Sequence, residues 1–221
     1  EEEYQLADFV AASPRDPGGM IEELRAIASG VSDVWLRRLL GLVLDSCASE
    51  LQRAPAAARI HHPYLGGLLE HILSLCGAAA KLCEHYPRLN RDLLLAGCVL
   101  HDIGKLRELD ASGVAIHYTV SGRLVGHVAE GLLLVDRLAD AIEGFPAETL
   151  MLVRHLIVSH HGEPEFGALR QPATPEALAL HYLDNLDAKL DHAWRLIDAA
   201  PGEQFSAWDP ALKREIYRGG A

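Results

Sequence analysis

Histidines and aspartates interrupt the apolar stripes of several segments that have helical periodicity, and this pattern limits the fold more than any other feature of the chain. Leu68, His71 and Leu75 follow the spacing of one helical face. The same spacing puts further polar residues on apolar faces, namely His101, Asp102 and His160. A buried polar group costs free energy unless it finds a partner, so we expect these faces to meet around a shared ligand.

Most of the chain has the apolar spacing of helices, and no segment alternates in the manner of a half-buried strand. The helices that we expect are residues 20–28, 31–51, 67–86, 90–104, 121–141, 146–161 and 175–199, with Trp35, Leu39, Leu42 and Val43 on one stripe of the second. Loops at 106–119 and 162–174 follow polar inward residues and are natural rims for a pocket. The sequence therefore predicts an all-α helical bundle with a polar site in its core.

The chain has the length of one domain with additions at both ends. We expect residues 1–60 to form a lead-in and helices that pack on the core, 61–200 the central domain, and 201–221 a C-terminal tail. No apolar run reaches the roughly 18 residues that span a bilayer, and three glutamates begin the chain where a secretory signal would be basic. The cysteines show no CxxC spacing, which indicates reduced thiols in a cytoplasmic protein without a membrane partner.

The formal net charge of −11 argues against tight, sequence-independent binding of nucleic acid by this segment alone. Such binding requires clustered lysines and arginines on one surface. A small anionic substrate, or one strand end presented to a metal, remains compatible with the charge, because bound cations reverse the local field.

The polar residues on the inward faces are imidazoles and carboxylates, the ligands that divalent transition metals bind. We expect a first ion to be held by His71, His101, Asp102 and Asp184. Asp102 has a second oxygen with which it can bridge to another cation. A water held between two metals about 3.5–4 Å apart becomes a hydroxide nucleophile at neutral pH, while the metals polarise a phosphoryl group.

The second ion would take Asp102, His127 and His160, with His161 either a further ligand or facing the phosphate of a substrate. We expect two ions, of which Mn²⁺ or Fe²⁺ are favoured, with Mg²⁺, Co²⁺, Ni²⁺ and Zn²⁺ as alternatives. The sequence thus predicts a binuclear metal site that activates water against a phosphate ester.

Three further residues are candidates for contact with the substrate or support of the ligands. Lys105 follows His101 by about one helical turn and could reach a phosphate, although a solvated lysine at a helix end has the same pattern. Arg123 could clamp a phosphate through two parallel hydrogen bonds, or be an ordinary surface residue. Asp187 lies three residues after Asp184 and could orient a ligand or a water.

His101-Asp102-Ile103-Gly104-Lys105, with an upstream histidine and a downstream aspartate, resembles the HD-domain metal-dependent phosphohydrolases. A longer match is to the YhaM-type 3′–5′ exoribonucleases and covers roughly residues 20–200. It rests on the stretches 61–71 (HHPYLGGLLEH), 122–127 (GRLVGH), 159–162 (SHHG) and 181–189 (HYLDNLDAK). The combined set is far more specific than the five-residue motif.

This resemblance implies an HD-domain bundle that hydrolyses a nucleotide or the 3′-terminal phosphodiester of single-stranded RNA. Members of the YhaM group usually carry an OB-fold domain for nucleic acid ahead of the HD domain, and no such segment precedes Met20. We therefore expect such a domain either to lie upstream or to be missing. The sequence is also compatible with a homo-oligomer. No Gly-Tyr-Pro motif occurs, and Gly104-Lys105 follow the dyad where stringent-response hydrolases usually have an acidic pair.

Two other functions remain open at this point. A nucleotide-binding regulatory HD module would hold metal and ligand without turnover. An HD oxygenase would use a similar ligand order to hold a redox-active pair of iron ions. A metal-dependent phosphohydrolase, with 3′–5′ exoribonuclease as its most specific form, is the function that we expect.

Overall fold

The computed structural model describes residues 11–58, 62–113, 115–199 and 202–219. Its helices are α1 (Pro17–Ser29), α2 (Val34–Leu51), α3 (Gly67–His85), α4 (Arg91–Leu100), α5 (Lys105–Glu108), α6 (Val120–Leu124), α7 (His127–Asp140), α8 (Ala147–Ser159), the 3-10 helix η2 (Pro164–Phe166) and α9 (Pro175–Asp198). The strands β1 (Leu109–Asp110) and β2 (His117–Tyr118) pair antiparallel, with Leu109 opposite Tyr118. The expectation of an all-α fold is confirmed.

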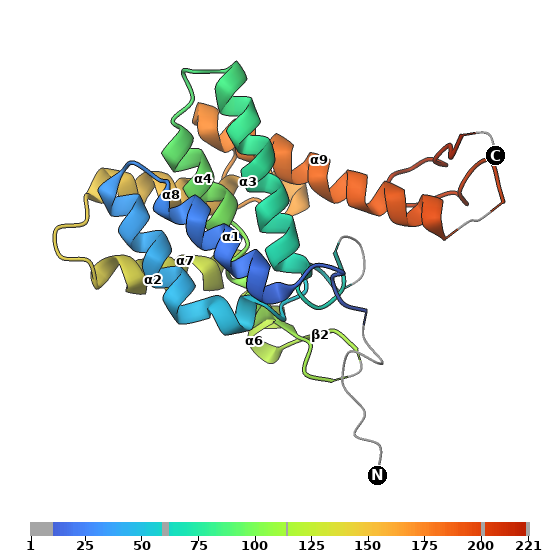
Figure 1. Ribbon diagram of the computed structural model, residues 1–221, viewed down its shortest axis with the longest axis horizontal. Coiled ribbons are helices and arrows are strands. Elements are labelled where there is room, and N and C mark those ends of the chain that lie inside the picture. The colour runs from blue at the N-terminus through green and yellow to red at the C-terminus, as the bar shows by residue number, and fades with distance from the viewer. Residues whose placement is uncertain (1–10, 59–61, 114, 200–201, 220–221) are drawn as a thin grey trace, which may run out of the picture.

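Helix α4 lies in the middle of the bundle, packed against α2, α3, α8 and α9 (Figure 1). Every residue from Leu93 to Leu100 is buried, as expected of a helix that is apolar on all sides. Gly97 allows a close approach, because a Cβ there would lie 2.9 Å from Leu156 Cδ1 and 3.1 Å from Leu180 Cδ2. This central position carries the residues that follow α4, His101 and Asp102, into the interior.

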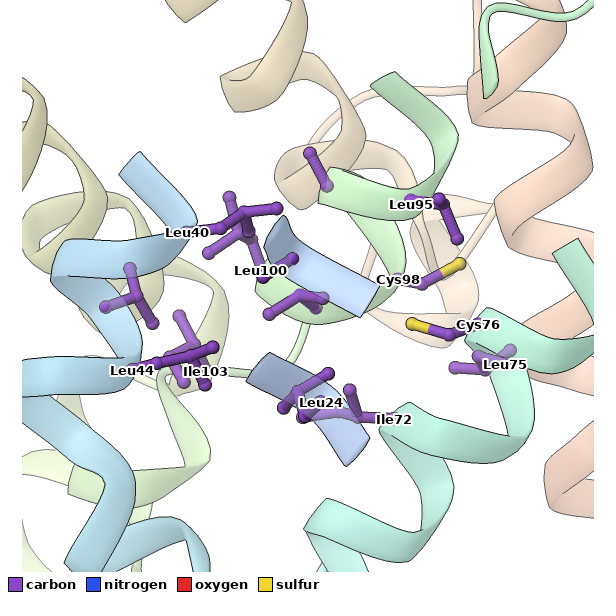
Figure 2. Packing of buried hydrophobic residues seen from close by; sticks show 14 of the residues in the cluster. Leu24, Leu40, Leu44, Ile72, Leu75, Cys76, Leu95, Cys98, Leu100 and Ile103 are labelled. Atoms are coloured by element: carbon purple, nitrogen blue, oxygen red, sulfur yellow. The ribbon is translucent and has the colours of Figure 1, made fainter. Parts of the chain in front are cut away.

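The N-terminal helices α1 and α2 belong to the same hydrophobic core as the rest of the bundle. Leu24 of α1 and Leu44 of α2 lie near Ile72 and Ile103 in one buried cluster (Figure 2). Their starts are set by side-chain caps: Asp33 accepts hydrogen bonds from the backbone N–H groups of the first turn of α2, at 2.8 and 2.9 Å. All four cysteines are free thiols, and none of the described helices is long and apolar enough to cross a membrane.

Three expected boundaries differ from the structure. The helix expected at 121–141 is two helices, because Gly126 adopts φ 78° and ψ 156° and breaks the chain between α6 and α7. The helix expected at 90–104 ends at Leu100 and gives way to turns that lead into α5. The loop expected at 106–119 includes part of α5 and the β1–β2 pair.

The buried face of α2 is rotated from the expected stripe. Leu36, Leu39, Leu40 and Val43 are buried, whereas Trp35 is half-buried and packs edge-on against Phe145, with ring centroids 6.2 Å apart. Residue 61, the first of the stretch 61–71 that carries part of the family resemblance, lies outside the described residues.

Gly104 is the closest contact between the turn after α4 and helix α7. A Cβ at this position would lie 1.9 Å from the backbone oxygen of His127 and 2.5 Å from the backbone nitrogen of Gly131. Backbone atoms cannot rotate aside, so we expect Gly104→Ala to lower the free energy of unfolding by about 2–4 kcal/mol. Chemical denaturation followed by circular dichroism measures this change.

Gly77→Ala is the matched control, because Gly77 lies inside α3 with nothing within 4 Å of its added Cβ. Alanine is the better helix former, so this variant should gain roughly 0.5–1 kcal/mol. Equal stability of the two variants would contradict the packing described here.

Candidate metal centre

Two histidines of the interior have one ring nitrogen held by a carboxylate. His71 of α3 has Nδ1 2.7 Å from Asp187 Oδ2, and His127, the first residue of α7, has Nδ1 3.0 Å from Glu108 Oε1. An acceptor beside Nδ1 holds the proton there and raises the basicity of the other nitrogen. In both rings Nε2 is therefore the atom presented to the centre of the bundle.

Two further histidines are held in the same manner by backbone oxygens. His101 Nδ1 lies 3.0 Å from the carbonyl oxygen of Cys98, and His160 Nδ1 lies 2.7 Å from that of Ile157. Each carbonyl lies three residues earlier, at the last turn of α4 or α8, where helix carbonyls lack an intrahelical partner. The helix ends thus orient both rings with Nε2 directed away from their own helix.

The first group of converging atoms joins α3, the end of α4 and α9. His71 Nε2 lies 3.2 Å from Asp184 Oδ1, and His101 Nε2 lies 3.8 Å from the same oxygen. His101 Nε2 is also 3.3 Å from Asp102 Oδ2, and 3.3 Å from His71 Nε2. Ligand atoms about 2.0–2.2 Å from a common transition metal have separations of this size.

The second group joins α7 and the end of α8 to the other oxygen of Asp102. Asp102 Oδ1 lies 3.4 Å from His127 Nε2 and 3.6 Å from His160 Nε2. His161 Nε2 is 3.0 Å from His127 Nε2. The two carboxylate oxygens of Asp102 therefore face two different sets of imidazoles, which is the arrangement of a carboxylate that bridges two ions.

The residues present fit a pair of divalent cations. Asp102 Oδ1 and His160 Nε2 are buried and have no hydrogen-bond partner among the described residues, so each lacks the partner that burial requires. Four carboxylates, those of Asp102, Glu108, Asp184 and Asp187, surround the cluster. Among the residues that the structure describes, Lys105 is the one lysine or arginine paired with any of them within 4.0 Å. Two divalent ions would supply both the missing contacts and the missing positive charge.

The surroundings of the cluster keep its buried carboxylates ionised and keep one of its rings, that of His160, neutral. Burial acts to raise the pKa of Asp102, but the Lys105 ammonium and the nearby His101 ring hold it well below its ordinary value. Burial likewise opposes ionisation of Asp184, whose pKa is lowered by the hydrogen bond from His71. Burial and the His101 ring lower the pKa of His160, so this ring is neutral and ready to bind a metal.

The expected supporting residues occupy three different places. Lys105 is buried, and its Nζ lies 2.5 Å from Asp102 Oδ2. Arg123 is exposed and lines a cavity of about 590 Å³ together with Lys105, His127 and His161. Asp187 lies behind His71, where its carboxylate also accepts from the hydroxyl of Ser74, and it lines neither the 590 Å³ cavity nor the 710 Å³ cavity on α9. Its geometry suits the positioning of a ligand.

Three residues near the cluster were not assigned a role from the sequence. Glu108 accepts hydrogen bonds from both the backbone and the ring of His127. His62 is buried, with Nε2 3.3 Å from Asp187 Oδ2. His181 donates from Nδ1 to the carbonyl oxygen of His160, 2.8 Å away. Its ring fills the space beside Gly162, where a Cβ would lie 2.3 Å from the ring. Of these, His62 and His181 lie within stretches that the sequence singled out, 61–71 and 181–189, whereas Glu108 lies in none.

Two cavities meet at the same pair of residues. The larger, of about 710 Å³, is lined by Asp102, His160 and Asp184 and extends along α9. Among the described residues, it shares only Lys105 and His161 with the 590 Å³ cavity that Arg123 lines. A ligand that spans the cluster can therefore place one portion in each cavity.

The carboxylates behind His71 and His127 should control metal affinity without touching the metal. We expect Asp187→Asn and Glu108→Gln each to weaken Mn²⁺ binding about 10–100-fold, because each removes the charge that raises the basicity of a ligand nitrogen. Competition with a fluorescent chelator measures the affinity. Glu84→Gln, at an exposed residue of α3 paired with Lys81, is the control. Affinities within twofold of the native protein would contradict these roles.

His71 should make the metal-free protein less stable at alkaline pH. Burial lowers the pKa of His71, but the hydrogen bonds to Asp184 and Asp187 outweigh it and raise the pKa to about 9 from the ordinary 6.5. Because the folded state binds the proton of His71 more tightly than the unfolded state, the protonated ring stabilises the fold. This stabilisation is fully present below pH 6.5 and is lost as the pH rises through 9. In the presence of a chelator we expect a loss of about 2–3 kcal/mol between pH 6.5 and 9.5.

Denaturation at a series of pH values, compared with His71→Gln, isolates this contribution from the other groups that titrate in the same range. The native and variant profiles should diverge below pH 9. Parallel profiles would show that His71 is not the group responsible.

The comparisons with known proteins agree with this geometry. Residues 68–189 match the family model of the HD domain, and this range includes both groups of converging atoms. The chain is 37% identical over 220 residues to the 3′–5′ exoribonuclease YhaM of Bacillus velezensis, which covers 98% of this chain and 69% of that protein. The YhaM of Bacillus subtilis is 34% identical over 221 residues, with 99% and 69% covered. No solved structure matches at a significant level.

The family match spans more than half of the chain, and the likeness to the YhaM proteins extends over nearly all of it. The N-terminal helices α1 and α2, which lie outside the HD match, are within the range shared with these relatives. The chain therefore belongs to the HD-domain family of metal-dependent phosphohydrolases, and within it to the group of the YhaM-type proteins.

Proposed function

We propose that this protein is a metal-dependent phosphodiesterase that removes nucleotides from the 3′ end of single-stranded RNA. One observation carries the proposal: the two oxygens of the buried Asp102 face separate sets of imidazoles, His101 on one side and His127 with His160 on the other. This arrangement suits two bridged cations. Two such ions, when bound, would polarise a phosphoryl group and lower the pKa of a nearby water.

The residues of the chain have separate tasks in this reaction. His71, His101, Asp102 and Asp184 would hold one ion, and Asp102, His127, His160 and His161 the other. Lys105 lies between the two cavities, within reach of Asp102, and would neutralise a non-bridging oxygen of the phosphate. Arg123 borders the smaller cavity and would bind the phosphate of the departing nucleotide.

Cavities on both sides of the cluster favour a phosphodiester over a monoester as the substrate. A phosphodiester has a nucleoside on each side of the phosphate, so its two halves can occupy the 710 Å³ and 590 Å³ spaces while the phosphate lies at Lys105 and His161. Volumes of this size are typical of small-ligand sites. The 3′–5′ direction rests on the names of the relatives, which are 3′–5′ exoribonucleases.

The proposal extends to the metal and the compartment. Ligand sets that mix imidazoles with carboxylates suit Mn²⁺ and Fe²⁺, and we expect one of these to support the highest turnover. Four free thiols and the absence of a membrane-spanning helix among the described residues are compatible with a cytoplasmic protein.

Loss of the bridging charge should abolish turnover. We expect Asp102→Asn to reduce RNA hydrolysis with Mn²⁺ by at least about a hundredfold and to lower the number of bound ions, because an amide is a poor bridging ligand. Asparagine is preferred to alanine here, since it keeps an acceptor beside the buried Lys105 ammonium and so limits the loss of stability. Elemental analysis and the rate of product formation measure the two effects.

The direction of cleavage is tested with RNA labelled at its 5′ end. Stepwise shortening of the labelled strand is expected, together with release of single nucleotides and inhibition by a chelator. A substrate whose 3′ end is blocked should be resistant. Internal fragments from the blocked RNA, or undiminished hydrolysis by Asp102→Asn, would contradict the proposal.

A further inference from the structure

The last described residues of the chain form a hairpin that folds back along α9. The backbone N–H of Ser206 donates to the oxygen of Ile216 at 2.9 Å, and that of Arg218 donates to Gln204 at 2.9 Å. Phe205 and Tyr217 pack across it, with ring centroids 5.1 Å apart. We call residues 204–218 the C-terminal hairpin; it lies beyond the body of the bundle, beside the end of α9 (Figure 1).

The tip of the C-terminal hairpin is held in one conformation and fastened to α9. Asp209 accepts a hydrogen bond from the backbone N–H of Leu212 at 2.7 Å, and its other carboxylate oxygen lies 3.0 Å from His192 Nε2 of α9. The backbone N–H of Asp209 donates to Arg214 at 3.0 Å, and Lys213 adopts a left-handed φ of 54°. These contacts give Lys213 and Arg214 a defined place, although both are exposed.

This place is the wall of the larger cavity beside the metal centre. The 710 Å³ cavity has the cluster residues at one end, α9 along one side and residues 211–214 of the hairpin along another. The only carboxylates among its described lining are Asp102 and Asp184, both of the cluster. Its other charged groups are all cationic, namely Lys105, Lys189, Lys213 and Arg214.

The concentration of positive charge is unusual for this chain. The net charge is −11, yet the charged side chains in the described walls of one cavity beyond the cluster are cations alone. Among the described residues, neither Lys189 nor Lys213 has a carboxylate within 4.0 Å, so both are available to an anion from outside the protein. A wall of this kind complements a chain of phosphates.

An aromatic ring borders the same cavity. Phe166, at the end of η2, is 65% exposed and follows the His160-His161 pair by a short loop. The loop is fixed by Gly167, at φ 101°, and by the backbone bond from Leu169 to Val158 at 2.9 Å. An exposed, positioned ring beside cations is the combination that binds single strands, because any base can stack on it.

We propose that the cleft between α9 and the C-terminal hairpin binds the RNA strand on the 5′ side of the scissile phosphodiester. Lys189, Lys213 and Arg214 contact successive phosphates, and Phe166 stacks on a base. The 590 Å³ cavity then receives the 3′-terminal nucleoside. This inference rests on the proposed function, and it assigns strand binding to a segment that lies outside the HD-domain match at 68–189.

The test is the double variant Lys213→Glu, Arg214→Glu. Both side chains are exposed, so the melting temperature should stay close to that of the native protein. With Mn²⁺, the ratio of kcat/KM for a twelve-nucleotide oligoadenylate to that for a diadenylate is expected to fall at least about tenfold, because only the longer strand reaches the hairpin. The dependence of log KM on log salt should weaken by about 1.4, or roughly 0.7 for each lost phosphate contact.

The matched control is Lys81→Glu, Arg91→Glu, which makes the same change of charge at two exposed cations of α3 and α4 that line neither cavity beside the cluster. It should leave the ratio and the salt dependence unchanged. Phe166→Ala should lower the ratio without changing the salt dependence, since stacking involves no counterion release. A ratio within twofold of the native value for the hairpin variant, or an equal loss in the control, would overturn the inference.

The inference and the proposed function fail in different ways. If the native protein hydrolyses no RNA with any metal, the proposed function is wrong. Fluorescence anisotropy with a fluorescein-labelled twelve-nucleotide oligoadenylate then tests separately whether the cleft binds a strand. At least tenfold weaker binding by the hairpin variant than by the control supports strand binding there. Equal affinities for the two variants refute it.

Discussion

Asp102 is an ionised carboxylate that is almost removed from water, with 2% of its surface exposed, and the organisation of the interior follows from the need to stabilise it. One oxygen has Lys105 Nζ at 2.5 Å, while the other faces imidazoles and has no hydrogen-bond partner among the described residues. A buried charge without compensation would cost several kcal/mol. Helix α4 leads to this residue at the centre of the bundle, and a helix in that position must be apolar on every side. The groups that surround Asp102 come from the ends or starts of the neighbouring helices.

The orientation of the ligand nitrogens depends on the acceptors that hold the other nitrogen of each ring. Backbone oxygens at the ends of α4 and α8 hold His101 and His160, whereas the carboxylates of Glu108 and Asp187 hold His127 and His71. The first pair follows from helix geometry and needs no particular partner residue. The second pair joins separate elements of the fold, so α5 and α9 become part of the metal centre, although much of α9 lies outside it.

The distribution of charge separates catalysis from strand binding. Carboxylates gather at the cluster, where two cations would offset them. Four cations without an ion pair among the described residues line the two adjoining cavities, namely Arg123, Lys189, Lys213 and Arg214. An acidic protein can therefore act on a polyanion without a basic surface, because the attraction is confined to the path of the strand. The C-terminal hairpin contributes to this path at a distance from the chemistry, and its position depends on the His192–Asp209 pair.

The sequence by itself determined the helical class, the inward direction of the histidines and the types of ligand, because these depend on a periodicity of 3.6 residues and on side-chain chemistry. It could not determine the partner of each ligand. Asp184 and Asp187 differ by only about 60° around α9, so periodicity does not tell which faces the cluster and which lies behind His71. Glu108 lies in a four-residue helix too short for any pattern, and the break at Gly126 reflects where α6 and α7 pack. Tertiary structure decided these points, since they depend on contacts across the bundle. It also brought Lys213 and Arg214 to the cleft, through a hairpin whose own sequence carries no motif.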